Sequence, residues 1–104
     1  RKKTGRYPTF YAAQSYDTIM LINSAVTSVG GDLSNKKGMR TAMRKANFTS
    51  VRGPFKYGNN HFPIQNFYLR KAVKDTDGNY TTTIIKTVYT NHQDPYAKDC
   101  KMSW

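Results

Sequence analysis

Apolar residues recur every three or four positions between residues 10 and 29, which is the spacing of one face of an α-helix. Pro8 fixes one backbone angle before this stretch, and the Thr9 side chain can cap a helix that begins at Phe10. The pair Gly30-Gly31 then provides a stop signal. The pattern predicts one long amphipathic helix with a broad apolar face. Its apolar positions are Tyr11, Ala12, Ile19, Leu21, Ile22, Ala25, Val26 and Val29.

A second, weaker helical pattern covers residues 35–47, and Asp32 or Ser34 is placed to open it. Four small or flexible apolar residues fall on one side of this segment, at Met39, Ala42, Met43 and Ala46. Arg40, Arg44 and Lys45 fall on the other side and are expected to remain in water. Because the apolar stripe is thin, we expect this helix to lie on the outside of the fold.

The second half of the chain changes to the two-residue alternation of strands. A short strand is predicted at residues 55–57, a longer and bulged one at 64–74, and a returning strand at 80–89. Between the last two lies a tight turn, in which Asp77-Gly78 is a strong hairpin signal. The order of helix, helix and hairpin predicts an α/β unit. Its apolar helix face needs more sheet than these 104 residues supply.

Charge raises the question of an anionic partner, because 17 Lys and Arg oppose six Asp and no Glu, for a net charge of +11. The basic residues are dispersed, and only Arg1-Lys2-Lys3 form a run of three. We favour a solvated basic surface of an exported protein. The alternative is a small basic nucleic-acid-binding domain that stacks bases on its Tyr and Phe rings, although no known nucleic-acid motif is present. An anionic-membrane or cell-wall module rests on charge alone.

Residue types that support catalysis or metal binding are few. His61, His92, Asp94 and Cys100 could supply zinc ligands, but their spacing matches no metal motif. The sequence has no phosphate-binding glycine loop and no pair of carboxylates placed for acid–base chemistry. We therefore expect no enzyme activity, no metal and no cofactor. Both histidines are interpreted as loop residues that bond to backbone groups.

Three segments carry a family resemblance. Residues 53–70 read GPFKYGNNHFPIQNFYLR, residues 8–18 read PTFYAAQSYDT, and residues 92–102 read HQDPYAKDCKM. In this order they resemble the C-terminal part of solute-binding proteins of the branched-chain amino acid ABC transporter type, the type I periplasmic binding proteins. The resemblance covers nearly the whole chain. Family members are roughly three times longer, so it implies that residues 8–104 are the C-terminal segment of a two-lobed α/β protein, after a flexible or truncated lead-in at residues 1–7.

The resemblance also implies a function and a set of site residues. It implies an extracytoplasmic, periplasmic protein that binds a small amino acid, an amide or an aromatic carboxylate and delivers it to an ABC permease. Tyr7, Phe10 and Tyr11 are the candidates for ligand contact, and packing of these rings against a sheet is the alternative. Asp17 is expected to be an acceptor that stabilises a lobe rather than a ligand contact.

Cys100 is the single cysteine. In the oxidising compartment that the resemblance implies, it is a candidate for a disulfide with a cysteine outside this chain. A small buried residue and a free thiol remain as alternatives. If the natural chain has only 104 residues, we expect an oligomer or a domain swap to supply the missing sheet.

Overall fold

The computed structural model describes residues 3–102, so Arg1 and Lys2 of the basic run lie outside the described residues. Its first element is α1 (Phe10–Ser28), which begins where the sequence predicts. The Thr9 hydroxyl accepts a hydrogen bond from the Ala12 N–H at 3.3 Å. After the helix ends, Gly30 and Gly31 adopt φ angles of +61° and +84°, a region that favours glycine. The predicted start and stop of α1 are confirmed.

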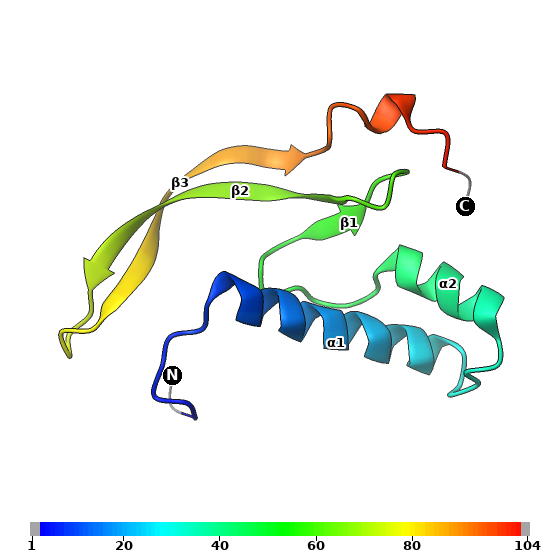
Figure 1. The fold of residues 1–104 in the computed structure, drawn as a ribbon, viewed down its shortest axis with the longest axis horizontal. Coiled ribbons are helices and arrows are strands. Elements are labelled where there is room, and N and C mark those ends of the chain that lie inside the picture. The colour runs from blue at the N-terminus through cyan, green and yellow to red at the C-terminus, as the bar shows by residue number, and fades with distance from the viewer. Residues whose placement is uncertain (1–2, 103–104) are drawn as a thin grey trace.

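Helix α2 (Lys36–Lys45) is shorter than the predicted range and has a different cap. Asn35 caps it, since its Oδ1 accepts from the Gly38 N–H at 2.9 Å. Asp32 does not serve as the cap, because its Oδ1 accepts from both the N–H and the hydroxyl of Ser34, at 2.9 and 2.6 Å, in the preceding turn. The helix ends at Lys45, and its C-cap Ala46 has a left-handed backbone with φ of +47°. Figure 1 shows α2 alongside the C-terminal part of α1.

The three predicted strands form one antiparallel sheet in the order β1-β2-β3. They are β1 (Phe55–Tyr57), β2 (Pro63–Lys74) and β3 (Tyr80–His92). The pairing of β2 with β3 is irregular between Gln65 and Tyr68 and between Leu69 and Arg70, which confirms the predicted bulge. Strand β3 runs three residues past the predicted end at Tyr89, because His92 still pairs with Gln65.

The turn between β2 and β3 is the one the sequence predicts. The Asp75 N–H donates to the Asn79 carbonyl at 2.9 Å, and the Gly78 N–H donates to the Asp75 carbonyl at 3.1 Å. Gly78 adopts a φ of +80°, which explains why glycine occupies this position. The hairpin projects as a long twisted arm away from α2 (Figure 1).

The C-terminal segment packs on the turn between β1 and β2. It contains the short 3-10 helix η1 (Ala97–Asp99). The Asn59 Nδ2 donates to the Ala97 carbonyl at 2.7 Å, and the Asn60 Nδ2 donates to the Asp94 carboxylate at 2.7 Å. Two neighbouring asparagines therefore hold a segment that is more than 30 positions away in the sequence.

The molecule exposes much more surface than a separate domain of its size. It measures 50 × 35 × 15 Å, and its radius of gyration is 17.0 Å, against about 13 Å for a compact domain of this length. The accessible surface is 8286 Å², where about 5,900 Å² is usual for this mass. The buried apolar side chains among the described residues are four alanines, at positions 25, 42, 46 and 97. This extended architecture fits one part of a larger folded unit.

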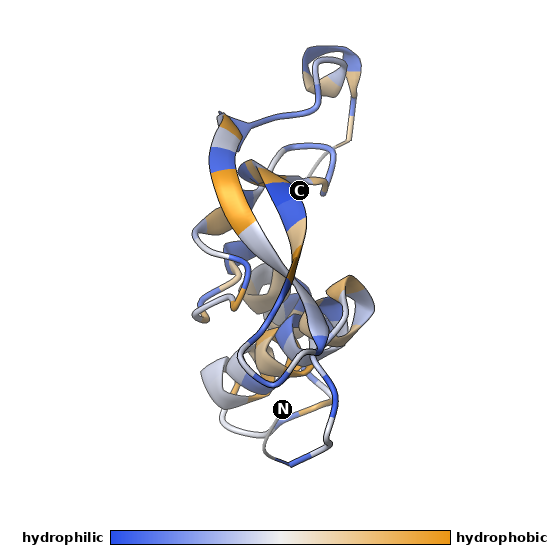
Figure 2. Cartoon of the chain, turned by 90° about the vertical axis from the view of Figure 1, so that its left-hand side faces the viewer, coloured by the Kyte–Doolittle hydropathy of each residue, from blue (hydrophilic) through white to orange (hydrophobic). Residues whose placement is uncertain are grey.

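The predicted amphipathic character of α1 is wrong. Its apolar side chains point in most directions around the helix axis, and Tyr16, Ile19 and Ile22 are exposed while Asp17 is buried. Figure 2 likewise shows hydrophobic residues on the strands as well as on the helices. A helix that is apolar on most sides is normally buried on most sides. The structure therefore agrees with the prediction that the apolar residues of α1 need more sheet to cover them than these 104 residues supply. Within residues 3–102, no helix combines the length and the apolar composition required to cross a membrane.

Candidate functional site

Three aromatic residues lie at or just before the N-terminal end of α1. Tyr7, Phe10 and Tyr11 are 38%, 61% and 76% exposed. The rings of Phe10 and Tyr11 meet edge to face, with their centroids 5.9 Å apart. Rings in this arrangement offer both faces and edges to a planar partner. We call these three residues the aromatic cluster.

The aromatic cluster is connected to the tip of the hairpin. The Tyr7 hydroxyl donates a hydrogen bond of 2.8 Å to the Asp75 Oδ2. Oδ1 of the same carboxylate accepts from the N–H groups of Asp77 and Asn79, at 2.9 and 2.8 Å. Asp75 therefore organises the turn with one oxygen and holds Tyr7 with the other. Figure 1 shows the chain before α1 and the hairpin tip on the same side of the molecule.

The chemistry at this end of α1 suits a small anion with an apolar body. The first turn of α1 contains no acidic side chain, so the partial positive charge of the helix N-terminus is not offset from within the helix. The carboxylate bound to the aromatic cluster is that of Asp75, which accepts from Tyr7 and from the hairpin turn. Backbone N–H groups at a helix N-terminus can donate hydrogen bonds to a carboxylate. The neighbouring rings of Phe10 and Tyr11 provide the apolar surface. Sequence reasoning selected all three residues of the cluster, but it did not predict the contact of Tyr7 with Asp75.

Asp17 forms a separate, buried network that anchors α1. Only 3% of this residue is exposed. Its carboxylate accepts from the Ser50 hydroxyl at 2.6 Å, from the Val51 N–H at 3.0 Å and from the Arg52 Nε at 2.9 Å. These contacts confirm that Asp17 is an acceptor within the fold. Sequence reasoning did not identify the three donors, because they lie more than 30 residues away.

The environment of Asp17 keeps it ionised. Burial by itself raises the pKa of this carboxyl. Hydrogen bonds from Ser50, Arg52 and Val51, together with the charge of Arg52, lower it further than burial raises it, so the pKa lies below its ordinary value of 3.8. Because its oxygens are occupied from within the chain, Asp17 has a structural role and is not part of the aromatic cluster.

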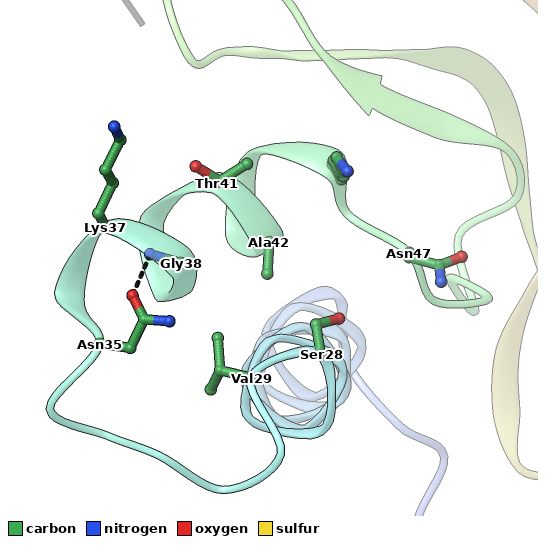
Figure 3. A pocket seen from close by; sticks show the side chains of 9 residues that line it. Ser28, Val29, Asn35, Lys37, Gly38, Thr41, Ala42 and Asn47 are labelled. Atoms are coloured by element: carbon green, nitrogen blue, oxygen red, sulfur yellow. Dashed lines mark hydrogen bonds between the residues drawn. The ribbon is translucent and has the colours of Figure 1, made fainter.

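An open groove of about 750 Å³ lies at the other end of α1, between its last turn and α2 (Figure 3). In Figure 3 the Asn35 side chain reaches the Gly38 N–H at the start of α2, as the cap requires. The groove contains no aromatic residue and no carboxylate, so its chemistry differs from that of the aromatic cluster. It is lined by Ser28, Val29, Asn35, Lys37, Gly38, Thr41, Ala42, Lys45 and Asn47.

The two histidines lie in different settings. His61 belongs to the turn between β1 and β2, where it has a φ of +63° and its backbone N–H donates to the Gly58 carbonyl at 3.0 Å. His92 is not a loop residue, which corrects the sequence interpretation, because it closes β3. Its ring lies 4.9 Å from the Tyr89 ring and 5.5 Å from the Phe67 ring. His92 thus belongs to an aromatic group on the hairpin.

The residue types that bind metal ions form no metal site among the described residues. In the part of the chain that the structure describes, no three His, Cys, Asp or Glu side chains come together to hold a metal ion. The half-buried Cys100 is a free thiol there, and the sequence holds no second cysteine that could pair with it. A disulfide with a cysteine outside this chain remains a prediction.

Comparison with known proteins identifies relatives of the whole architecture. A family model described as periplasmic binding protein matches residues 1–79. Among solved structures, the chain is similar to a solute-binding protein of an ABC transporter from R. palustris, determined in complex with benzoate. The two share 34% sequence identity and superpose with a TM-score of 0.79, over 96% of this chain and 26% of that one. A search of curated proteins gave no match.

Proposed function

Because the chain belongs to the periplasmic binding protein family, of the branched-chain type, we propose that the protein containing it captures a small aromatic carboxylate for delivery to an ABC permease. The chain itself is part of an ABC transporter solute-binding protein, and this family binds solutes rather than catalysing reactions. This chain spans 26% of the length of the solved relative. Members of the family are typically extracytoplasmic.

The observation that carries the choice of solute is the relative with benzoate. That protein is 34% identical over almost all of this chain, and its structure was determined with an aromatic carboxylate. The aromatic cluster offers matching chemistry, since the exposed rings of Phe10 and Tyr11 can cover a planar ring and the N-terminus of α1 favours a negative group. A small amino acid or an amide would bind at the same N-terminus of α1 but would leave much of the surface of the aromatic rings uncovered.

The proposed mechanism is binding with closure. The solute would bridge two lobes, and the closed form would be stabilised only by the difference in solute affinity between the closed and open forms. Tyr7 would take part from the hairpin side, since Asp75 holds its hydroxyl. The permease would then receive the closed form at the outer face of the membrane.

The proposal is tested by calorimetric titration of the full-length protein with benzoate, leucine and leucinamide. We expect benzoate to bind most tightly. Replacing Tyr11→Ala should weaken benzoate binding about tenfold, which corresponds to roughly 1.4 kcal/mol. Tyr16→Ala is the matched control, because Tyr16 is an exposed tyrosine on the same helix outside the aromatic cluster. Tight binding of leucine without benzoate binding would overturn the choice of solute, and equal effects of both variants would remove the aromatic cluster from the site.

A further inference from the structure

Helix α2 separates its charged residues from its apolar residues more sharply than α1 does. Its ten residues include five Lys or Arg and no Asp or Glu. At 100° per residue the basic positions occupy one side of the helix, and the apolar positions, with the buried Ala42, occupy the other. Lys36, Arg40 and Arg44 follow one another at four-residue intervals and so form one row. We call the basic side of α2 the basic arc; it consists of Lys36, Lys37, Arg40, Arg44 and Lys45.

The elements packed against α2 do little to neutralise this arc. The only charged residue of α1 is Asp17, and that carboxylate is occupied by Ser50, Val51 and Arg52. The only charged residue of β1 is Lys56, a further cation. In the sequence, no acidic residue occurs between Asp32 and Asp75. In the part of the chain that the structure describes, α1 and β1 therefore leave no carboxylate to neutralise the exposed members of the basic arc, Lys36, Lys37, Arg40 and Lys45.

The basic arc is also a surface that the complete protein is expected to leave open. Lys36, Lys37, Arg40 and Lys45 are exposed. Burying such cations beneath another part of the protein would require a carboxylate for each of them. The exposed isoleucines of α1 are in the opposite situation, because burial stabilises them. The two helices therefore differ in which of their surfaces remains available for another molecule.

We propose that the basic arc of α2 holds the solute-binding protein against the anionic phospholipid headgroups of the membrane that contains its permease. This inference rests on the proposed function, since delivery to a permease brings the protein to a membrane surface and not to nucleic acid. Each Lys or Arg that reaches an anionic membrane strengthens binding roughly fivefold. The attraction fades over about 8 Å at physiological salt, so it acts only when the arc faces the membrane closely.

The test is sedimentation of the full-length protein with vesicles of phosphatidylcholine, with and without phosphatidylglycerol. We expect binding only to the anionic vesicles, and a steep loss of binding as salt is raised. A triple variant with Lys36→Gln, Lys37→Gln and Arg40→Gln should lose about a hundredfold in vesicle affinity, because three contacts of about fivefold each are removed. Glutamine keeps a high helix propensity, so α2 should persist, and thermal unfolding checks this.

The matched control removes the same charge from elsewhere, with Lys3→Gln, Lys98→Gln and Lys101→Gln at exposed positions outside both α2 and the β2–β3 hairpin. This variant should keep most of the vesicle affinity. Equal losses in both variants would overturn the proposal in favour of an effect of net charge. Failure of the unmodified protein to bind anionic vesicles would also overturn the proposal. So would an α2 variant that binds vesicles as well as the unmodified protein does but no longer binds a single-stranded oligonucleotide. Benzoate titration of the α2 variant reports on solute binding separately, so failure of one proposal is distinguishable from failure of the other.

Discussion

The helical part of the molecule and the β2–β3 hairpin are stabilised in contrasting ways. In the helical part, Asp17 on α1 is buried and receives three hydrogen bonds from the loop that leads to β1. Among the residues that the structure describes, the hairpin has no buried charged residue, and its acceptor Asp75 lies in the turn at the tip. All of β3 except Thr81 is exposed, and the strand is held by its ladder with β2. The helical part thus has an anchor of its own, while the arm depends mainly on backbone pairing.

The contrast teaches which part of the chain needs a partner. Successive residues of a strand point to opposite faces of a sheet, and the neighbours Ile84 and Ile85 are 49% and 58% exposed. A strand with large apolar residues on both faces is normally covered on both sides. β3 is also an edge of the sheet. We therefore expect the arm to be ordered largely by other parts of a longer solute-binding protein.

The largest expected effect comes from removing the anchor of the helical part. In the full-length protein, Asp17→Asn should lower the free energy of unfolding by about 3 kcal/mol, because Arg52 loses its charged partner in a partly buried place. Denaturant unfolding measures the loss. Asp99→Asn is the control, since Asp99 is exposed. A cost below that of the control would show that the network does not anchor α1.

The same carboxylate makes stability depend on pH, with a smaller effect than its replacement. The pKa of Asp17 in the folded protein lies below its value in the unfolded chain, because its hydrogen-bond donors outweigh the effect of burial. Between these two pKa values the unfolded chain binds more protons, so stability is fully present above about pH 5 and is lost as the pH falls through the folded value. The stability difference between the unmodified protein and Asp17→Asn should therefore shrink on acidification.

The pKa of Asp32 is also lowered, by its hydrogen bonds from Ser34. This contribution is present in both proteins and cancels from the difference. Unfolding curves collected from about pH 6 to pH 3 test the prediction. A difference that stays constant over this range would contradict the assignment of the acid-sensitive stability to Asp17.

A pair of glycines compares the two regions with the same chemical change. Gly31 lies in the turn between α1 and α2, and Gly78 lies in the hairpin turn, with φ angles of +84° and +80°. An added methyl group would meet no atom within 4 Å at either place. Gly31→Ala and Gly78→Ala should therefore each introduce a similar backbone strain, of about 1 kcal/mol. We expect hydrogen exchange to accelerate around the end of α1 in the first variant and along β2 and β3 in the second. Acceleration of both regions in both variants would show that the arm and the helices unfold as one unit.

The parts of the fold that sequence reasoning predicted depend on near neighbours. Thr9 caps α1 by accepting from an N–H only three residues ahead, and Gly78 provides the positive φ of the turn in which it lies. Asn35 was missed as the cap of α2 because Asp32 and Ser34 are equally good capping types, and only the structure shows that they bond to each other. The amphipathic prediction for α1 failed for a different reason. A period of three to four residues identifies a helix without revealing how many of its sides are apolar.

In the candidate site, too, the features predicted from the sequence are those that involve near neighbours. The aromatic cluster was found through a family resemblance at the start of α1, and its three members are close in the sequence. The donors to Asp17 and the contact between Tyr7 and Asp75 are separated by 33 to 68 positions, and no local pattern encodes them. What remained hidden from the sequence is therefore the set of contacts that join the helical part to the rest of the chain.

The smallest expected effect is on the bond that joins the two regions at the aromatic cluster. Tyr7→Phe removes the hydroxyl that donates to Asp75 and keeps the ring. Because this hydrogen bond is exposed, its loss should cost about 0.5 kcal/mol of stability, near the lower limit for such bonds. Hydrogen exchange at residues 75–79 should accelerate slightly, while the other hydrogen bonds of Asp75 keep the turn formed. Tyr16→Phe is the control, since Tyr16 is an exposed tyrosine of α1 away from the cluster.

If Tyr7 acts in solute binding through its position, Tyr7→Phe should weaken benzoate binding although the ring is retained. If benzoate binding is unchanged while exchange in the turn accelerates, the bond serves the attachment of the arm and Tyr7 does not belong to the site.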